Sequence, residues 1–215
     1  MAESQSLSLG VDVSSGSWFA VAFDRSGFDH AAVFDEIGEL WHRYEERVSH
    51  VFIDMPIGLI EQGEEGRKCD DLARDVLGPR SRSVFTPPVR EATRRHSYKA
   101  AKRVNERKSG RSLSKQAYNI SQNIAEVDDL LRNVPEAREA FVESHPEVCF
   151  RALAGDPLQH SKRKAGGYAE RMRTLATFDA DAPAAVQSAA AAAADAEVAV
   201  DDVLDATVLA YAARS

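Results

Sequence analysis

The sequence predicts an α/β fold built on one mixed β-sheet, and three observations favour it. Residues 7–34 contain three short segments with a strand-like apolar pattern, separated by turn residues. Residues 35–48 change to helical spacing, and an apolar run at 51–54 follows directly. Helical patterns then dominate the chain. With 215 residues, of which 44% are hydrophobic, the chain is long enough to bury the core of such a domain.

The first three strands are expected to form an antiparallel meander. They span residues 7–13, 17–23 and 28–34. Ser14-Ser15-Gly16 and Arg25-Ser26-Gly27 lie between them and favour tight turns. The fourth strand ends at Asp54, and a helix precedes it. We therefore expect this strand to return beside the first one and to pair with it in parallel.

Most of the remaining chain is predicted to be helical. The expected helices span residues 64–77, 91–108, 113–133, 165–178, 184–194 and 201–213. A loop is expected at 81–90, and a fifth strand at 141–150 is expected to carry His145-Pro146-Glu147. The sequence contains no internal repeat and no linker rich in Gly and Ser. We therefore expect a single domain over residues 1–215, with a helical insertion at about 61–140.

Charge is distributed unevenly along the chain, whose net charge is −7. Residues 67–116 contain 15 basic and 5 acidic side chains, a net charge of +10, so the remainder carries −17. A basic segment within an acidic protein indicates a polyanionic partner. We expect nucleic acid, DNA or RNA, to bind through this segment. The alternative is a solvated helical surface that balances the acidic remainder.

Cysteine usage and hydropathy indicate a cytoplasmic protein. Cys69 and Cys149 stand eighty positions apart without a CxxC motif, so the sequence predicts neither a disulfide framework nor a zinc site. Residues 1–8 lack the basic start and apolar core of a secretory signal. No apolar run approaches the ~20 residues that cross a bilayer, so we expect no membrane role.

Acidic residues stand at positions where solvated surface acids are not expected. Asp12 interrupts the apolar first strand and Asp54 ends the fourth, so parallel pairing would bring both carboxylates to one edge of the sheet. Asp202 and Asp205 share a face of the last predicted helix, which is apolar enough to pack on the core. Glu147, in the predicted fifth strand, is a further candidate.

Clustered carboxylates repel one another, and a metal ion relieves that repulsion. Mg²⁺ and Mn²⁺ prefer oxygen ligands, and two such ions about 3.5–4 Å apart promote phosphodiester hydrolysis. The acids therefore predict a site for Mg²⁺ or Mn²⁺. Taken singly, Asp54 is more typical of a turn or a helix cap, and Asp201-Asp202 of the acidic first turn of a helix. The joint pattern is more specific than any one member.

These residues lie in segments that resemble the DUF429 family, described as predicted nucleases of the ribonuclease H-like fold. The similar segments are Gly10-Val11-Asp12, IDMPIGL at 53–59, RKCDDLARDVLG at 67–78, Ser83-Val84-Phe85, LSKQ at 113–116, His145-Pro146-Glu147-Val148, Ser161-Lys162 and DDVLDA at 201–206. They occur in order and span residues 10–206, which is nearly the whole chain.

The resemblance implies a ribonuclease H-like mixed sheet, three antiparallel strands followed by two parallel ones, flanked by helices. Within that superfamily it is most similar to Holliday-junction resolvases, in which paired acids on the final helix complete the metal site. By position, Asp12 and Asp54 would be the strand ligands, and Asp202 with Asp205 the helix pair. Asp201 is an alternative to Asp202. Asp54 stands where resolvases use Glu, which shortens its reach by one methylene.

Further residues take roles through this resemblance or through the basic segment. Glu147 belongs to the family's His-Pro-Glu motif and would either bind the metal or support its ligands. The side chains expected to hold the phosphate backbone are Arg67, Arg74, Arg80, Arg82, Gln116 and Lys162. Gln116 and Lys162 have this role by resemblance only. Arg67 and Arg74 have an alternative role as ion-pair partners of Asp71 and Asp75.

The leading hypothesis is a divalent-metal-dependent nuclease that hydrolyses phosphodiester bonds by a two-metal-type mechanism, with Glu147 as an auxiliary catalytic residue. The alternative is a nucleic-acid-binding or regulatory module on the same fold, without turnover. A third hypothesis is phosphotransfer, because Asp12-Val13-Ser14-Ser15-Gly16 faintly resembles the phosphate loop of the actin and sugar-kinase superfamily. The sequence has neither a second copy of such a domain nor an adenosine-binding Gly motif, both of which that superfamily uses. The oligomeric state is left open, with a homodimer among the alternatives.

Overall fold

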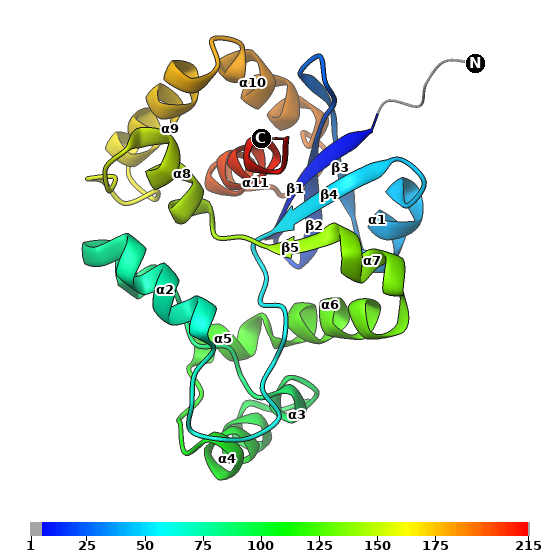
Figure 1. Cartoon of the computed structure of the whole chain (residues 1–215), viewed down its shortest axis with the longest axis vertical. Coiled ribbons are helices and arrows are strands. Elements are labelled where there is room, and N and C mark those ends of the chain that lie inside the picture. Colours follow the sequence, from blue (N-terminus) through cyan, green and yellow to red (C-terminus); the bar gives the residue numbers. More distant parts are fainter. Residues whose placement is uncertain (1–5, 215) are drawn as a thin grey trace. The chain divides into compact units, whose positions relative to one another are not determined.

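The computed structural model describes residues 6–214, which form two compact units. The sheet unit combines residues 6–54 with 135–214, and the helical unit consists of Met55–Val134 (Figure 1). The helical unit therefore lies between two segments of the sheet unit along the chain. A single domain with an insertion at about 61–140 stays a prediction.

The sheet unit is built on a mixed sheet of five strands, counted over residues 6–214. Its strands are β1 (Leu7–Ser14), β2 (Ser17–Phe23), β3 (Phe28–Phe34), β4 (Val48–Ile53) and β5 (Phe141–Glu143). They lie in the order β3-β2-β1-β4-β5. β1 to β3 pair antiparallel, whereas β4 pairs with β1, and β5 with β4, in parallel. The predicted meander and the parallel return of the fourth strand are confirmed.

Helices flank this sheet, and one of them is almost completely buried. The helices of the sheet unit are α1 (Ile37–Tyr44), α7 (Pro135–Ala140), α8 (Pro146–Ala154), α9 (Ala165–Phe178), α10 (Ala182–Ala192) and α11 (Val200–Arg214). α8 to α11 pack with β2 in one apolar cluster, which includes Phe19, Phe150 and Leu175. α11 is buried on every side from Val203 to Ala210. It lies against β1, with α8, α9 and α10 around it (Figure 1).

A glycine on β1 permits the close contact with α11. A Cβ atom at Gly10 would lie 2.0 Å from the carbonyl oxygen of Ala206 and 2.2 Å from the backbone nitrogen of Ala210. The two backbones therefore touch at a distance that no other residue type at position 10 allows. Side chains two positions apart on a strand face the same side of the sheet. Asp12 consequently faces α11, as Gly10 does.

The fifth strand is shorter than predicted. The expectation of a strand at 141–150 is wrong beyond Glu143, because α8 begins at Pro146. Proline suits the first helical position, where its missing N–H leaves no bond unmade. The Nδ1 atom of His145 caps this helix by accepting from the backbone N–H of Glu147 at 3.2 Å. His145 and Glu147 therefore stand at a helix start and not on a strand.

The helical unit contains more and shorter helices than predicted. They are α2 (Lys68–Leu77), the 3-10 helix η1 (Gly78–Ser83), α3 (Arg90–Thr93), α4 (Tyr98–Ser109), α5 (Lys115–Asn119) and α6 (Ser121–Asn133). The continuous helix expected at 91–108 is wrong, because Ser97 caps α4 by accepting from the backbone N–H of Ala100 at 3.3 Å. The helix expected at 113–133 is interrupted at Ile120. None of the helices between residues 6 and 214 has the length and apolar content needed to span a membrane.

Replacing Gly10 tests the contact between β1 and α11. Gly10→Ala should reduce the free energy of unfolding by about 3 kcal/mol or more, because a methyl group cannot enter a backbone contact of 2.0 Å without displacing the helix. Gly38→Ala in α1 is the matched control, since a Cβ there meets no described atom within 4 Å. It should change the stability by less than about 1 kcal/mol. Urea unfolding measures both, and equal stability of the two variants would contradict the close contact.

Candidate active site

Two of the candidate acids stand at the same end of neighbouring parallel strands. Asp12 lies near the end of β1 and is 8% exposed, and Asp54 directly follows β4. The backbone N–H of Asp54 donates to the carbonyl oxygen of Val11 at 3.0 Å, which extends the parallel pairing of β1 and β4 by one residue. The backbone N–H of Val13 donates to Oδ1 of Asp12 at 2.7 Å. The two carboxylates therefore lie at one edge of the sheet.

The other two candidates come from the first turns of α11. Asp202 and Asp205 are one turn apart, and Asp205 is only 2% exposed. Because α11 contacts β1 at Gly10, these acids lie on the side of the sheet that Asp12 faces. Their charges act on Asp12, since both raise the pKa of its carboxyl group. Asp202 also raises the pKa of Asp54.

The four aspartates share a poorly solvated environment. Burial, followed by the charges of Asp54, Asp205 and Asp202, raises the pKa of Asp12 well above its ordinary value. Burial likewise raises the pKa of Asp54, of Asp202, and of Asp205, the last to about 7. The ionised cluster is therefore unfavourable by itself and requires a cation.

Lys162 supplies one such cation. Its Nζ atom lies 2.5 Å from Oδ2 of Asp205 and 3.6 Å from Oδ2 of Asp201. Burial lowers the pKa of Lys162, but the carboxylates of Asp205, Asp12 and Asp54 raise it by a larger amount. The pKa of Lys162 is therefore higher than its ordinary value. The resemblance gave Lys162 a place among the phosphate contacts. The structure places its ammonium group among the acids.

Glu147 is part of an adjacent ion pair. Its Oε1 atom accepts a hydrogen bond from Nη2 of Arg171, a residue of α9 that is completely buried. Nη1 of the same arginine donates to the carbonyl oxygen of Gly167 at 3.0 Å. Glu147 also raises the pKa of Asp205, after the larger effects of burial and Lys162. Glu147 thus lies near the acids while its own carboxylate is paired.

Arg171 was not among the predicted site residues, although the sequence carries a signal for it. Gly167, Arg171 and Leu175 are spaced four residues apart, and they are the buried residues of α9. An arginine within a buried helical stripe needs an acidic partner inside the protein. His145 was also absent from the predicted site, although its ring caps the helix that carries Glu147.

The acids offer the ligand atoms that a hard divalent ion requires. All are carboxylate oxygens, which Mg²⁺ and Mn²⁺ prefer. Oδ1 of Asp205 is buried and has no hydrogen-bond partner in the part of the chain that the structure describes. Within residues 6–214, no three of the four aspartates place one oxygen each within 4.8 Å of one another. The donor chemistry therefore fits a divalent ion, and one ligand atom is unsatisfied, while the acids remain more widely spaced than the ligands of a single compact site.

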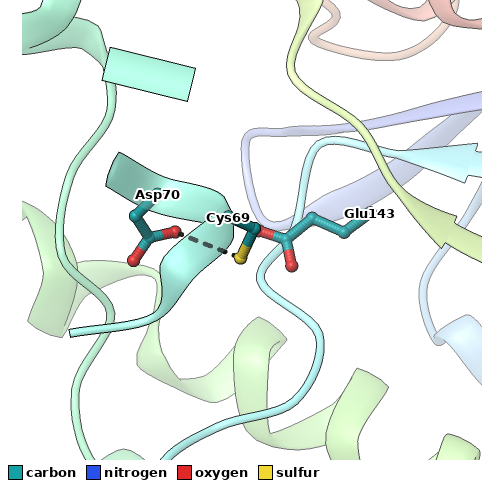
Figure 2. Close-up of side chains that lie close together, drawn as sticks. All are labelled: Cys69, Asp70 and Glu143. Atoms are coloured by element: carbon teal, nitrogen blue, oxygen red, sulfur yellow. Dashed lines mark hydrogen bonds between the residues drawn. The ribbon is translucent and has the colours of Figure 1, made fainter. Parts of the chain in front are cut away.

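Of the residues expected to bind phosphate, two arginines are engaged within the helical unit. Arg67 is buried, pairs with Asp70 and donates to the carbonyl oxygen of Ile57 at 2.8 Å. Figure 2 shows Asp70 at the start of α2, where it also accepts from Sγ of Cys69 at 3.8 Å. Arg74 pairs with Asp71 at 2.8 Å. Arg74 thus forms one of the ion pairs that the sequence offered as an alternative to phosphate binding. Arg67 also forms an ion pair, but with Asp70 and not with Asp71 or Asp75.

The remaining basic surface is less positive than its sequence count indicates. Residues 55–134 carry 16 basic and 11 acidic side chains, a net charge of +5. Arg90 and Arg94 both pair with the buried Asp128 of α6, at 2.9 and 2.7 Å. Arg80 is half-buried in η1, whereas Arg82 and Gln116 are exposed. Arg82 and Gln116 are the predicted phosphate contacts of this unit that are most open to solvent.

Replacing Asp12 by Asn tests the mutual repulsion of the acids in the absence of metal. Because the pKa of Asp12 is raised in the folded protein, that state binds its proton more tightly, and stability falls as the pH rises above the unfolded-state pKa of about 3.9. Asp12→Asn should therefore raise the melting temperature at pH 7 in EDTA by at least about 2–4 °C, the shift that ~1 kcal/mol produces in a domain of this size.

The pH dependence and an opposite control complete this test. The gain from Asp12→Asn should shrink at pH 5, where the folded carboxyl is more often protonated. Asp24→Asn should lower the melting temperature at pH 7, because the hydroxyl of Ser26 lowers the pKa of Asp24. Differential scanning calorimetry measures both variants. A destabilised Asp12→Asn protein at pH 7 would contradict the repulsion.

Comparison with known proteins identifies the family of the chain. A family model described as "Protein of unknown function (DUF429)" matches residues 10–215, which include all of the candidate acids. Searches among curated proteins and among solved structures gave no match. Since the match covers nearly the whole chain, the protein belongs to the DUF429 family.

Proposed function

We propose that this protein is a divalent-metal-dependent nuclease that hydrolyses phosphodiester bonds of nucleic acid. The observation that carries this proposal is an acidic cluster around the buried Asp12 of β1, whose carboxyl group is under the charges of Asp54 at the end of β4 and of Asp202 and Asp205 at the start of α11. The strand order, three antiparallel strands followed by two parallel ones, supports a ribonuclease H-like fold. Site and fold together favour phosphodiester hydrolysis over other reactions of buried carboxylates.

The metal would be Mg²⁺ or Mn²⁺, held by Asp12, Asp54, Asp202 and Asp205. A bound ion of this kind activates water and stabilises the charge on the leaving oxygen. The unpaired Oδ1 of Asp205 is a ready ligand atom. Asp12 is held in place by the N–H of Val13, and Asp54 by the backbone pairing with Val11. The ligand side chains are thus positioned by regular secondary structure, which favours a fixed geometry.

The supporting residues have separate roles in this proposal. Glu147, as an auxiliary residue, would fix Arg171 beneath the site and contribute negative charge near Asp205. Exposed basic and polar residues of the helical unit, Arg82 and Gln116 in particular, would contact the phosphate backbone. Such contacts position a nucleic acid without reading its sequence. The proposed substrate class is therefore nucleic acid in general.

A nucleic-acid-binding module without turnover is the alternative proposal, and the Lys162–Asp205 ion pair favours it. An ammonium group at 2.5 Å already neutralises part of the acidic cluster. The turn that resembles a kinase phosphate loop has its hydroxyl groups engaged within the protein. The loop from Ser14 to Gly16 is a tight turn, and the hydroxyl groups of Ser14 and Ser15 donate to the carbonyl oxygen of Glu197 at 3.2 and 3.0 Å.

Cleavage assays on the acidic variants test the nuclease proposal. Asp12→Asn and Asp205→Asn should each reduce Mn²⁺-stimulated cleavage by at least about 100-fold, because each removes a charged metal ligand. Asp24→Asn lies outside the cluster and should retain cleavage. Labelled single strands, duplexes and junctions of DNA and RNA form the substrate panel, and circular dichroism checks folding. Undiminished cleavage by folded Asp12→Asn protein would contradict the assignment, and binding without cleavage by the wild type would favour the alternative.

Salt-dependent binding tests the role of the basic residues. The double variant Arg82→Ala/Gln116→Ala should bind nucleic acid more weakly and should reduce the slope of log K against log salt concentration by about 1, since each charged phosphate contact contributes about 1. Arg43→Ala, an exposed arginine of α1, is the control and should leave the slope unchanged. Fluorescence anisotropy at several salt concentrations measures both. Identical slopes for all three proteins would place the nucleic-acid surface elsewhere.

A further inference from the structure

Lys162 is held in the acidic cluster by its own loop. The segment before it lies directly on α9, because a Cβ atom at Gly167 would be 2.0 Å from the carbonyl oxygen of Ser161. The carboxylate of Glu170 accepts from the backbone N–H groups of Gln159 and His160, at 2.7 and 2.9 Å. The ammonium group is thus delivered by an anchored backbone and not by a freely moving surface side chain.

Arg171 fastens the same loop from inside the protein. Its Nη1 atom donates to the carbonyl oxygen of His160 at 3.3 Å, while its Nη2 atom pairs with Glu147. The side chain is completely buried, so the guanidinium end of this contact is shielded from solvent. Glu147 of α8, Arg171 of α9 and the loop that carries Lys162 therefore form one connected support for the ammonium group.

The two oxygen atoms of Asp205 have different surroundings. Oδ2 lies 2.5 Å from Nζ of Lys162, whereas Oδ1 is buried without a hydrogen-bond partner among the described residues. An ionised carboxylate accepts on both oxygens. Asp205 is 2% exposed, so solvent contributes little to satisfying Oδ1. Oδ2 of Asp205 is therefore paired with a cation, and Oδ1 is not.

We propose that the Lys162 ammonium group permanently fills one cation position of the acidic cluster, so that the site takes a single divalent ion, with Asp205 shared between the two cations. This inference rests on the proposed metal-dependent function and replaces one of the two ions of a two-metal site by a lysine. A second divalent ion would have to bind beside Oδ2 of Asp205, where a positive charge already stands, and the two cations would repel each other.

The number of Mn²⁺ ions bound per chain tests this inference. Isothermal titration calorimetry and Mn²⁺ electron paramagnetic resonance on the full chain should give one ion for the wild type. Lys162→Met, which keeps the length of the side chain but removes its charge, should bind two. Arg163→Met, an exposed neighbour in the same loop, should still bind one. Ions bound by the double variant Asp12→Asn/Asp205→Asn are counted as lying outside the cluster and are subtracted.

Each outcome distinguishes this inference from the proposed function. Two ions in the wild type would overturn the inference without any variant and would leave the nuclease proposal standing, provided that cleavage still requires Asp12. One ion in both the wild type and folded Lys162→Met would show that the lysine does not exclude a second ion, which also overturns it. Absence of Mn²⁺ binding to both proteins would overturn the metal-dependent function itself. One ion in the wild type and two in Lys162→Met would support both.

Discussion

The backbone contact between β1 and α11 is the constraint on which the candidate site depends. Because Gly10 has no side chain, the carbonyl oxygen of Ala206 and the backbone nitrogen of Ala210 occupy the space where a Cβ atom would lie. This contact fixes the height of α11 over the sheet. The acids at the start of α11 are thereby held on the side of the sheet that Asp12 faces, and the backbone of β4 holds Asp54 beside β1. A single glycine thus connects the core packing to the arrangement of charged groups.

Other residues of the sheet unit offset the free-energy cost of burying these acids. Burial alone disfavours the charged form of each aspartate, and their mutual repulsion adds to that effect. Lys162 opposes both effects, and α8 and α9 hold its loop through Glu147, Glu170 and Arg171. A buried charge without a partner is strongly destabilising, and the ion pairs Lys162–Asp205 and Arg171–Glu147 each supply a counter-charge. Oδ1 of Asp205 is a buried acceptor without a hydrogen-bond partner among the described residues, and for that reason it points to a ligand.

In the helical unit, ion pairs formed in the folded protein neutralise part of the positive charge counted along the sequence. The segment 67–116 has a net charge of +10, but acids outside it approach its arginines in space. Asp128 of α6 accepts from both Arg90 and Arg94, and Glu61 pairs with Arg90. Part of the basic excess therefore stabilises the packing of α3 on α6. The surface left for a polyanion is smaller, and it is represented by exposed residues such as Arg82.

The sequence by itself determined the elements whose signals are local. Alternating apolar residues and turn residues specified the meander, helical spacing of apolar residues specified α1, and the position of Asp12 inside an apolar strand marked it as unusual. Only the tertiary structure decided what long-range contacts control. The fifth strand ends at Glu143 because Pro146 and the His145 cap start a helix there, a competition between two local patterns that the apolar run does not resolve. Likewise, the placement of Lys162 and Arg171 depends on groups far along the chain, whose proximity arises only when α8, α9 and α11 pack together.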